Sequence, residues 1–172
     1  MGIKISDIPP EGVTLNLALD LDLFGRESTS TACSAILAIN PLAGNTFHLA
    51  GRVKAMPVLE CSRCLAQFSL AIDAEWEVDL APIASAAGAA AERELVTGEL
   101  DTEFYEGDEL DTENLVQEQV LIAIPMVPLH RQDCKGLCSV CGADLNTTEC
   151  GHQRNAPGEF SAFSALKDLL KK

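Results

Sequence analysis

Apolar and polar residues alternate along much of the first half of the chain. Apolar side chains occupy every second position from Val13 to Leu23, from Phe47 to Ala55 and from Phe68 to Leu80. A period of two places one set of side chains on each face of a β-strand. The segment Thr29–Asn40 is rich in Thr, Ala and Ile, which predicts a further strand. Short turns between these segments favour antiparallel pairing. We therefore predict four strands in one antiparallel sheet.

The second half of the chain carries a helical pattern. Apolar residues recur at three- and four-residue steps from Leu115 to Ile124, Asp111 can cap the helix, and Pro125 stops it. A last helix is predicted at about residues 160–171, and the Ala-rich segment 85–94 fits either a short helix or a mobile insertion. The order of elements predicts an α+β fold, with helices packed on an antiparallel sheet. The pattern leaves open whether that sheet curls into a barrel.

The length of 172 residues fits one domain. Within it we distinguish residues 1–82 as mainly strands, 83–109 as an acidic and Ala-rich insertion, and 110–172 as helix, cysteine loop and helix. The first residues lack the basic start and apolar run of a signal peptide, and no apolar run is long enough to span a bilayer. We therefore expect a cytoplasmic protein that does not bind membranes.

The net charge of −14 comes from one part of the chain. Residues 73–118 hold fifteen of the 26 acids and a single base, Arg93. Such acidity argues against a general nucleic-acid binder, because phosphate contacts need Lys and Arg. The preferred interpretation of the acidic stretch is a solvated surface. The alternative is a binding site for a basic partner.

Cysteine spacing is the strongest chemical signal. A C-x2-C pair stands at the predicted hairpin tip, and a later loop carries C-x3-C-x2-C-x8-C. Clustered thiols in a cytoplasmic protein indicate metal ligation, and Zn²⁺ takes four such ligands in a tetrahedron. We nominate six metal ligands: Cys61, Cys64, Cys134, Cys138, Cys141 and Cys150.

Six thiols exceed the four positions on one zinc ion, so two sets are considered. The local set is Cys134, Cys138, Cys141 and Cys150. It closes a short loop at low entropic cost. The paired set joins Cys61 and Cys64 to Cys138 and Cys141, as in a zinc ribbon. Spacing does not choose between them. In either case four sulfurs would fill the coordination shell, which makes the site structural and not catalytic.

The remaining reactive side chains have simpler interpretations. His130 and His152 flank the cysteine loop, and either could replace a thiol as a metal ligand. The preferred interpretation is that both are ordinary surface side chains. Cys33 stands alone in a strand and is expected to be a small buried apolar residue. The sequence contains no nucleophile elbow, phosphate-binding glycine loop or HExxH motif, so it predicts neither an enzyme nor a small-molecule substrate.

The amino-acid sequence around the cysteines resembles that of the YceD family of bacteria and plastids. The matching stretches include Leu59–Leu65, Leu121–Pro125, Asp133–Cys138 with Cys141-Gly142, and Leu145-Asn146. The resemblance covers most of the chain from Val53 onward. It implies a non-enzymatic factor that supports accumulation of 23S ribosomal RNA and assembly of the large ribosomal subunit, with ribosomal RNA or ribosomal proteins as partners.

Under that hypothesis the bases near the cysteines are candidate RNA contacts: Arg52, Lys54, Arg63, Arg131, Lys135 and Arg154. Two alternatives come from other functional classes. A thiol-based redox or metal sensor would use the clustered cysteines reversibly. A metalloenzyme would need only three protein ligands and a bound water.

Overall fold

The computed structural model describes residues 2–25, 30–83 and 102–152. The Ala-rich segment 85–94, the last predicted helix and Arg154 lie outside these residues. The chain divides into two compact units. Unit 1 comprises Met1–Leu59 and Gln67–Pro128, and unit 2 comprises Glu60–Ala66 and Leu129–Lys172. The prediction of a single domain over residues 1–172 stays a prediction.

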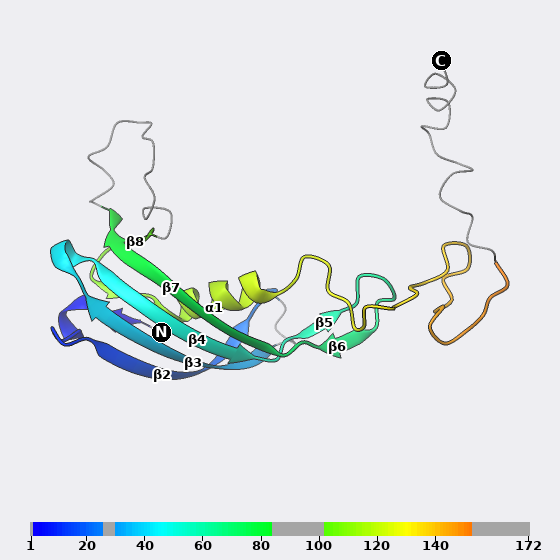
Figure 1. Ribbon diagram of the computed structural model, residues 1–172, viewed down its shortest axis with the longest axis horizontal. Helices are drawn as coiled ribbons and strands as arrows, with labels where there is room; N and C mark the ends of the chain where they lie inside the picture. The colour runs from blue at the N-terminus through cyan, green and yellow to red at the C-terminus, as the bar shows by residue number, and fades with distance from the viewer. Residues whose placement is uncertain (1, 26–29, 84–101, 153–172) are drawn as a thin grey trace, which may run out of the picture. The chain divides into compact units, whose positions relative to one another are not determined.

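Unit 1 is built on a five-stranded sheet with the order β2-β3-β4-β7-β8 (Figure 1). Its strands are β2 (Val13–Asp22), β3 (Ser30–Pro41), β4 (Phe47–Ala55), β7 (Ile72–Pro82) and β8 (Thr102–Tyr105). The first four pair antiparallel, as the alternating pattern predicts. β8 pairs parallel to β7, so the sheet is mixed. Residues 83–101 separate those two strands, a connection long enough for a parallel return.

The predicted strand boundaries need correction at two places. The strand predicted from Phe47 ends at Ala55 as β4, and after Met56 and Pro57 a separate short strand, β5 (Val58–Glu60), follows. Proline has no N–H for the ladder, which explains a break there. The next predicted strand likewise divides into β6 (Gln67–Ser69) and β7. β5 and β6 form a separate two-stranded sheet with the C-x2-C pair between them, so the predicted hairpin tip is confirmed.

The five-stranded sheet is open, with β2 and β8 as its edges. The possible barrel is therefore not found among the described strands. A second small sheet pairs β1 (Ile3–Lys4) with β9 (Glu109–Leu110), and 3-10 turns η1 (Ile5–Asp7) and η2 (Ala43–Asn45) complete the described elements of the first half. The fold is mostly sheet, and the described residues contain one α-helix.

That helix, α1 (Thr112–Ala123), covers the inner face of the sheet at β4 and β7 (Figure 1). The Asp111 carboxylate accepts a hydrogen bond from the Asn114 backbone amide at 3.2 Å, so the predicted cap is confirmed. Leu115, Val116 and Val120 are buried against the sheet. They join the inward side chains of the central strands, among them Leu37, Ile39, Leu49, Val53 and Leu80. The alternating pattern assigns Leu49, Val53 and Leu80 to one face, whereas the segment of Leu37 and Ile39 was predicted as a strand from its composition.

One inward position of β4 is a glycine, Gly51, because the side chain of Trp76 on β7 occupies the space beside it. Gly51 stands directly opposite Trp76 in the register of the two strands. A Cβ atom at Gly51 would come within 2.4 Å of the indole ring, far inside van der Waals contact. The absent side chain therefore makes room for the only tryptophan of the chain.

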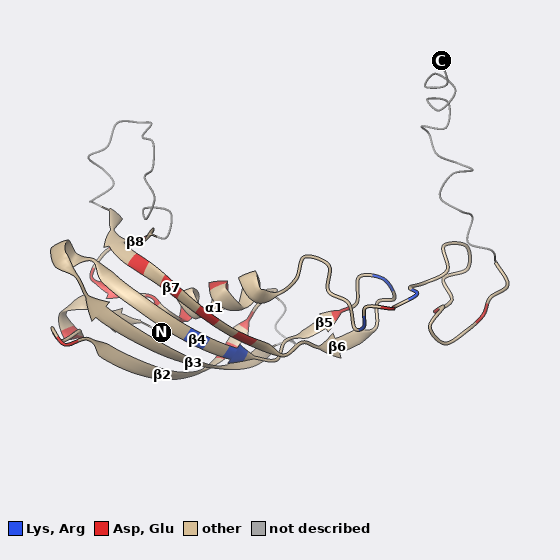
Figure 2. Ribbon diagram, viewed as in Figure 1, with Lys and Arg blue, Asp and Glu red and all other residues tan. Residues whose placement is uncertain are grey.

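The outer face of the sheet carries a cross-strand ladder of charges. Figure 2 shows acids spaced along β7 and bases on the neighbouring β4. Arg52 donates two hydrogen bonds to Asp73, each 2.8 Å long, and its guanidinium lies 3.0 Å from Glu75. The imidazole of His48 lies 2.8 Å from Asp79. Part of the acidic stretch is thus a solvated strand face whose charges are paired across the sheet.

Candidate metal centre

The C-x2-C pair between β5 and β6 forms a tight turn. The Leu65 amide donates to the Cys61 carbonyl at 2.9 Å, and the Cys61 amide donates to the Ala66 carbonyl at 2.9 Å. Leu65 has a φ of 60°, an unusual conformation for a residue with a branched side chain. These bonds fold the turn so that both Cys61 and Cys64 are buried. The turn thereby holds two sulfurs on one side of the chain.

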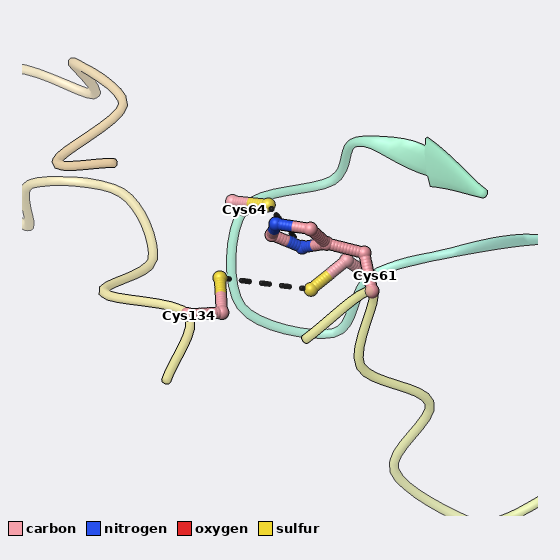
Figure 3. Close-up of side chains that lie close together, drawn as sticks. Cys61, Cys64 and Cys134 are labelled. Carbon is pink, nitrogen blue, oxygen red and sulfur yellow. Dashed lines mark hydrogen bonds between the residues drawn. The ribbon is translucent and has the colours of Figure 1, made fainter. Parts of the chain in front are cut away.

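Two residues from the later half of unit 2 complete a group around this turn. The Sγ atoms of Cys61 and Cys134 lie 3.8 Å apart, and the Nδ1 atom of His130 lies 3.4 Å from the Sγ of Cys64. Figure 3 shows the three cysteine side chains gathered at the turn. The four ligand atoms all lie within 4.8 Å of one another. We call Cys61, Cys64, His130 and Cys134 the first Cys/His group.

Two of the spacings within this group match the edges of a tetrahedral zinc shell. Zinc–sulfur bonds of about 2.3 Å at the tetrahedral angle place two sulfurs about 3.8 Å apart, and a sulfur and a nitrogen about 3.6 Å apart. The observed 3.8 Å and 3.4 Å agree with those edges. A disulfide needs sulfurs only about 2.05 Å apart. The geometry therefore fits a shared cation and not a Cys61–Cys134 bridge.

Polar neighbours fix Cys134 from outside the group. Asn146 donates to the Cys134 sulfur at 3.5 Å through Nδ2, while its Oδ1 accepts from the Lys135 amide and from Arg131, each at 2.8 Å. Arg63 donates to the Cys134 carbonyl at 2.9 Å. Such outer contacts orient metal ligands and add to metal affinity. The turn and the later loop are thus joined by hydrogen bonds as well as by the thiols.

A second Cys/His group consists of Cys138, Cys141, Cys150 and His152, whose ligand atoms again lie within 4.8 Å of one another. Its C-x2-C turn repeats the bonding of the first. The Gly142 amide donates to the Cys138 carbonyl at 2.9 Å, and the Cys138 amide donates to the Ala143 carbonyl at 2.8 Å. Gly142, with a φ of 72°, takes the place that Leu65 has in the first turn. The Sγ of Cys138 lies 3.9 Å from Nδ1 of His152.

Cys61 and Cys64, two thiols of the first group, have pKa values shifted in opposite directions. Burial raises the pKa of Cys61, but hydrogen bonds from His130 and from nearby backbone amides outweigh it and lower that pKa to about 5. A hydrogen bond from the Ala66 backbone lowers the pKa of Cys64, yet burial and the neighbouring thiols of Cys134 and Cys61 raise it to about 11. The thiolate of Cys61 is therefore favoured near neutral pH, whereas Cys64 would need a cation beside it to ionise there.

The second group follows the same rule. Backbone hydrogen bonds from Cys141 and Val140 lower the pKa of Cys138 to about 6. At Cys150 a backbone hydrogen bond from His152 lowers the pKa, but the Cys138 thiol and burial outweigh it, so the net shift is upward. Each C-x2-C turn thus contains one cysteine, Cys61 or Cys138, whose lowered pKa favours the thiolate form that binds a metal ion.

The buried residues of the described part of unit 2 are almost all cysteines. In the part of unit 2 that the structure describes, they are Cys61, Cys64, Cys134, Cys138 and Gly136. Large apolar side chains such as Leu65 and Val140 are instead exposed. Small units without an apolar core generally depend on a bound metal or on disulfides. Both Cys/His groups could hold a metal ion, and the described part of unit 2 contains no apolar core that would stabilise it instead.

The structure divides the six nominated cysteines differently from the two sets considered in the sequence. Cys61, Cys64 and Cys134 lie in one group, and Cys138, Cys141 and Cys150 lie in the other. Neither the local set nor the paired set is gathered as four sulfurs. The difference arises because each group includes a histidine, His130 or His152, which the sequence placed on the surface. The available signal was their position, four residues before Cys134 and two after Cys150.

Other residues singled out in the sequence have structural partners. Cys33 is buried in the sheet of unit 1, as expected, and burial raises the pKa of its thiol. Among the candidate RNA contacts, Arg52 is engaged with Asp73 and Glu75, and Lys54 lies 3.8 Å from Asp73. Arg63 donates to backbone carbonyls of the cysteine loop. The sequence did not predict these ion pairs and hydrogen bonds.

The fold and the two groups define a mostly-β protein with paired Cys/His sites of metal-binding geometry. The family described as large ribosomal RNA subunit accumulation protein YceD matches residues 49–170, and the chain belongs to this family. An uncharacterized protein of Mycobacterium leprae is 35% identical over 123 residues, which are 71% of this chain. The chain spans about half, 52%, of that relative's length.

No solved structure matches this chain. Among the described helices, none has the length and apolar character needed to cross a bilayer.

Proposed function

We propose that this protein is a non-enzymatic factor, acting in the cytoplasm, that supports accumulation of 23S ribosomal RNA and assembly of the large ribosomal subunit. The observation that carries the proposal is membership of the YceD family across residues 49–170. The family description names accumulation of large-subunit ribosomal RNA. Ribosomal RNA or ribosomal proteins are the corresponding partners.

The metal in this proposal is a structural Zn²⁺ held by the first Cys/His group. Three thiolates and one imidazole are a usual donor set for structural zinc, and thiolates disfavour hard cations such as Mg²⁺. Four protein ligands leave no position for water or substrate on a tetrahedral ion. The group therefore supports a role in folding and not in turnover, which agrees with a non-enzymatic factor.

Unit 2 also supplies the basic side chains that could meet RNA. Arg63, Arg131 and Lys135 are exposed around the first Cys/His group. Asn146 and Asp133 contact Arg131, whose side chain is 44% exposed. A folded metal-bound loop would present these bases together. Arg52 and Lys54 belong to β4 of unit 1 and are paired with its acids, so we confine the proposed RNA contact to the bases of unit 2.

The test is crosslinking in growing cells, followed by sequencing of bound RNA and mass spectrometry of bound proteins. We expect enrichment of 23S ribosomal RNA or large-subunit proteins. The double variant Arg131→Ala/Lys135→Ala should lose RNA crosslinks, whereas Arg52→Ala/Lys54→Ala, a matched loss of two positive charges on β4, should retain them. Direct binding should also weaken steeply with added salt. Absence of ribosomal material from the wild-type sample would overturn the proposal.

A genetic measurement tests the same conclusion independently. Depletion of the protein should lower the ratio of 23S to 16S ribosomal RNA, and the wild-type gene should restore it. A ratio that does not change on depletion would contradict the proposed function, whatever the protein crosslinks to.

A further inference from the structure

The two C-x2-C turns of unit 2 are structural copies of one another. In each, the amide after the second cysteine donates to the carbonyl of the first, and the first cysteine's amide donates to a carbonyl five residues ahead. The residue after the second cysteine has a positive φ in both, at Leu65 and at Gly142. Each turn presents a pair of sulfurs, so each could supply two of the four ligands of a separate metal ion.

Each turn also has its own pair of additional ligands. His130 and Cys134 complete the first group, and Cys150 and His152 complete the second. No ligand is shared between the groups, and each offers three sulfurs and one imidazole. The six clustered cysteines are thus accounted for without surplus. This answers why the chain carries more thiols than one tetrahedral ion can use.

The groups differ sharply in their exposure to solvent. In the first, Cys61 is 0% exposed, Cys64 7% and Cys134 3%. In the second, Cys141 and His152 are exposed and Cys150 is partly so. An open hollow of about 230 Å³ lies against Cys150 and His152 and is also lined by Lys135 and Glu149. A competing ligand could approach the second group through this hollow, whereas protein surrounds the first.

We propose that unit 2 binds two separate metal ions of the zinc type, one in each Cys/His group, and that the ion of the second group exchanges much faster. The inner ion then serves the fold. The outer ion, bound by exposed Cys141 and His152, responds to the supply of free metal and of competing thiols. The proposal extends the zinc site of the proposed function to a second ion, and it does not depend on RNA binding.

The test begins with native mass spectrometry of the reduced full-length protein loaded with Zn²⁺. We expect two ions per chain. Cys141→Ser changes an exposed ligand and should leave one ion, as should His152→Ala. Cys33→Ala, which removes the cysteine outside both groups, should keep two. Fluorescence of the single tryptophan, Trp76, reports that unit 1 is folded in every sample.

Release of zinc to a chromogenic chelator then separates the two sites. The wild type should release its ions in two phases of equal amplitude, with rates more than about tenfold apart, because a chelator reaches the exposed ligands of the second group directly. Cys141→Ser should lose only the fast phase. Co²⁺ substitution should give absorption typical of tetrahedral sulfur ligation at both sites.

Three results would overturn the proposal: one ion in the wild type, two ions in Cys141→Ser, or loss of both ions from Cys141→Ser with Trp76 fluorescence unchanged. Release in a single phase would refute the difference in exchange. These failures are distinct from failure of the proposed function. A protein with one ion that still crosslinks to 23S ribosomal RNA would refute the second ion alone.

Discussion

The Nδ1 atom of His130 lies 3.4 Å from the Sγ atom of Cys64, although 66 positions separate the two residues in the chain. This contact brings the later loop of unit 2 to the hairpin turn. It also supplies the nitrogen that turns three sulfurs into a complete tetrahedral donor set. Stability of unit 2 and metal binding are therefore expected to depend on the same atoms.

Substitution of His130 should weaken metal binding at the first group selectively. His130→Ala leaves three ligands, and the affinity should fall by more than the roughly 10–100-fold typical of outer-shell changes. His130→Cys restores a fourth donor and should recover most of the affinity. His48→Ala, on β4, is the matched control. Competition with a chelator of known affinity measures the change, and equal affinities for His130→Ala and wild type would exclude His130 as a ligand.

Asn146 should influence the metal without touching it. Its side chain donates to the Cys134 sulfur and accepts from the Lys135 amide, so it orients that ligand. Asn146→Ala should lower the metal affinity of the first group by about 10–100-fold. The exposed Asn16→Ala on β2 should have no effect. If Asn146→Ala binds zinc as tightly as Asn16→Ala does, the hydrogen bond to sulfur has no part in affinity.

Removal of the metal should unfold unit 2 and leave unit 1 folded. Apart from Gly136, the described buried residues of unit 2 are the thiols themselves. Without a cation, the bonds that would hold the turn and the loop together are missing, and the described residues of unit 2 offer no apolar core in compensation. Amide signals from residues 130–150 should collapse toward random-coil shifts when chelator is added under reducing conditions, while those of β3 and β4 should persist. Unchanged spectra would contradict a structural role for the metal.

Gly51→Ala should destabilise unit 1 through a steric clash with Trp76. The added methyl would meet the indole ring at 2.4 Å, and overpacking of this kind costs about 1–3 kcal/mol of unfolding free energy. Denaturant unfolding measures the loss. In a Trp76→Leu background the ring is absent, so the same substitution should cost much less. An equal cost in both backgrounds would assign the effect to the backbone and not to the ring.

The ionised carboxylate of Glu103 should lower the free energy of unfolding at neutral pH. Burial and the nearby Glu118 raise the pKa of Glu103 above its ordinary value of 4.5. An acid whose folded-state pKa is raised costs stability once it ionises, at pH values above the unfolded pKa, and costs none below it. Glu103→Gln should therefore raise Tm at pH 7, and the gain should vanish near pH 3. The exposed Glu106→Gln is the control. A gain that persists at pH 3 would not be electrostatic.

Local patterns in the sequence predicted a large part of the fold. The alternation from Val13 to Leu23 predicted β2, and the three- and four-residue steps from Leu115 to Ile124 predicted α1 with its Asp111 cap. These elements follow from the periodicity of their own side chains. β8 was not predicted, because Thr102–Tyr105 is short, lies in an acidic stretch and is defined by its pairing with β7.

The candidate site shows the same division. The sequence by itself determined that six clustered cysteines serve as metal-ligand candidates, because C-x2-C spacing is a local property of one turn. Only the tertiary structure decided how they are divided, since Cys134 joins Cys61 across 73 positions while Cys138, four residues later, joins Cys150 and His152. The choice of partners depends on the path of the chain between the turns. No spacing rule contains that path, so the sequence offered the two histidines only as possible replacements for a thiol, and the folded loop places each of them beside three cysteines.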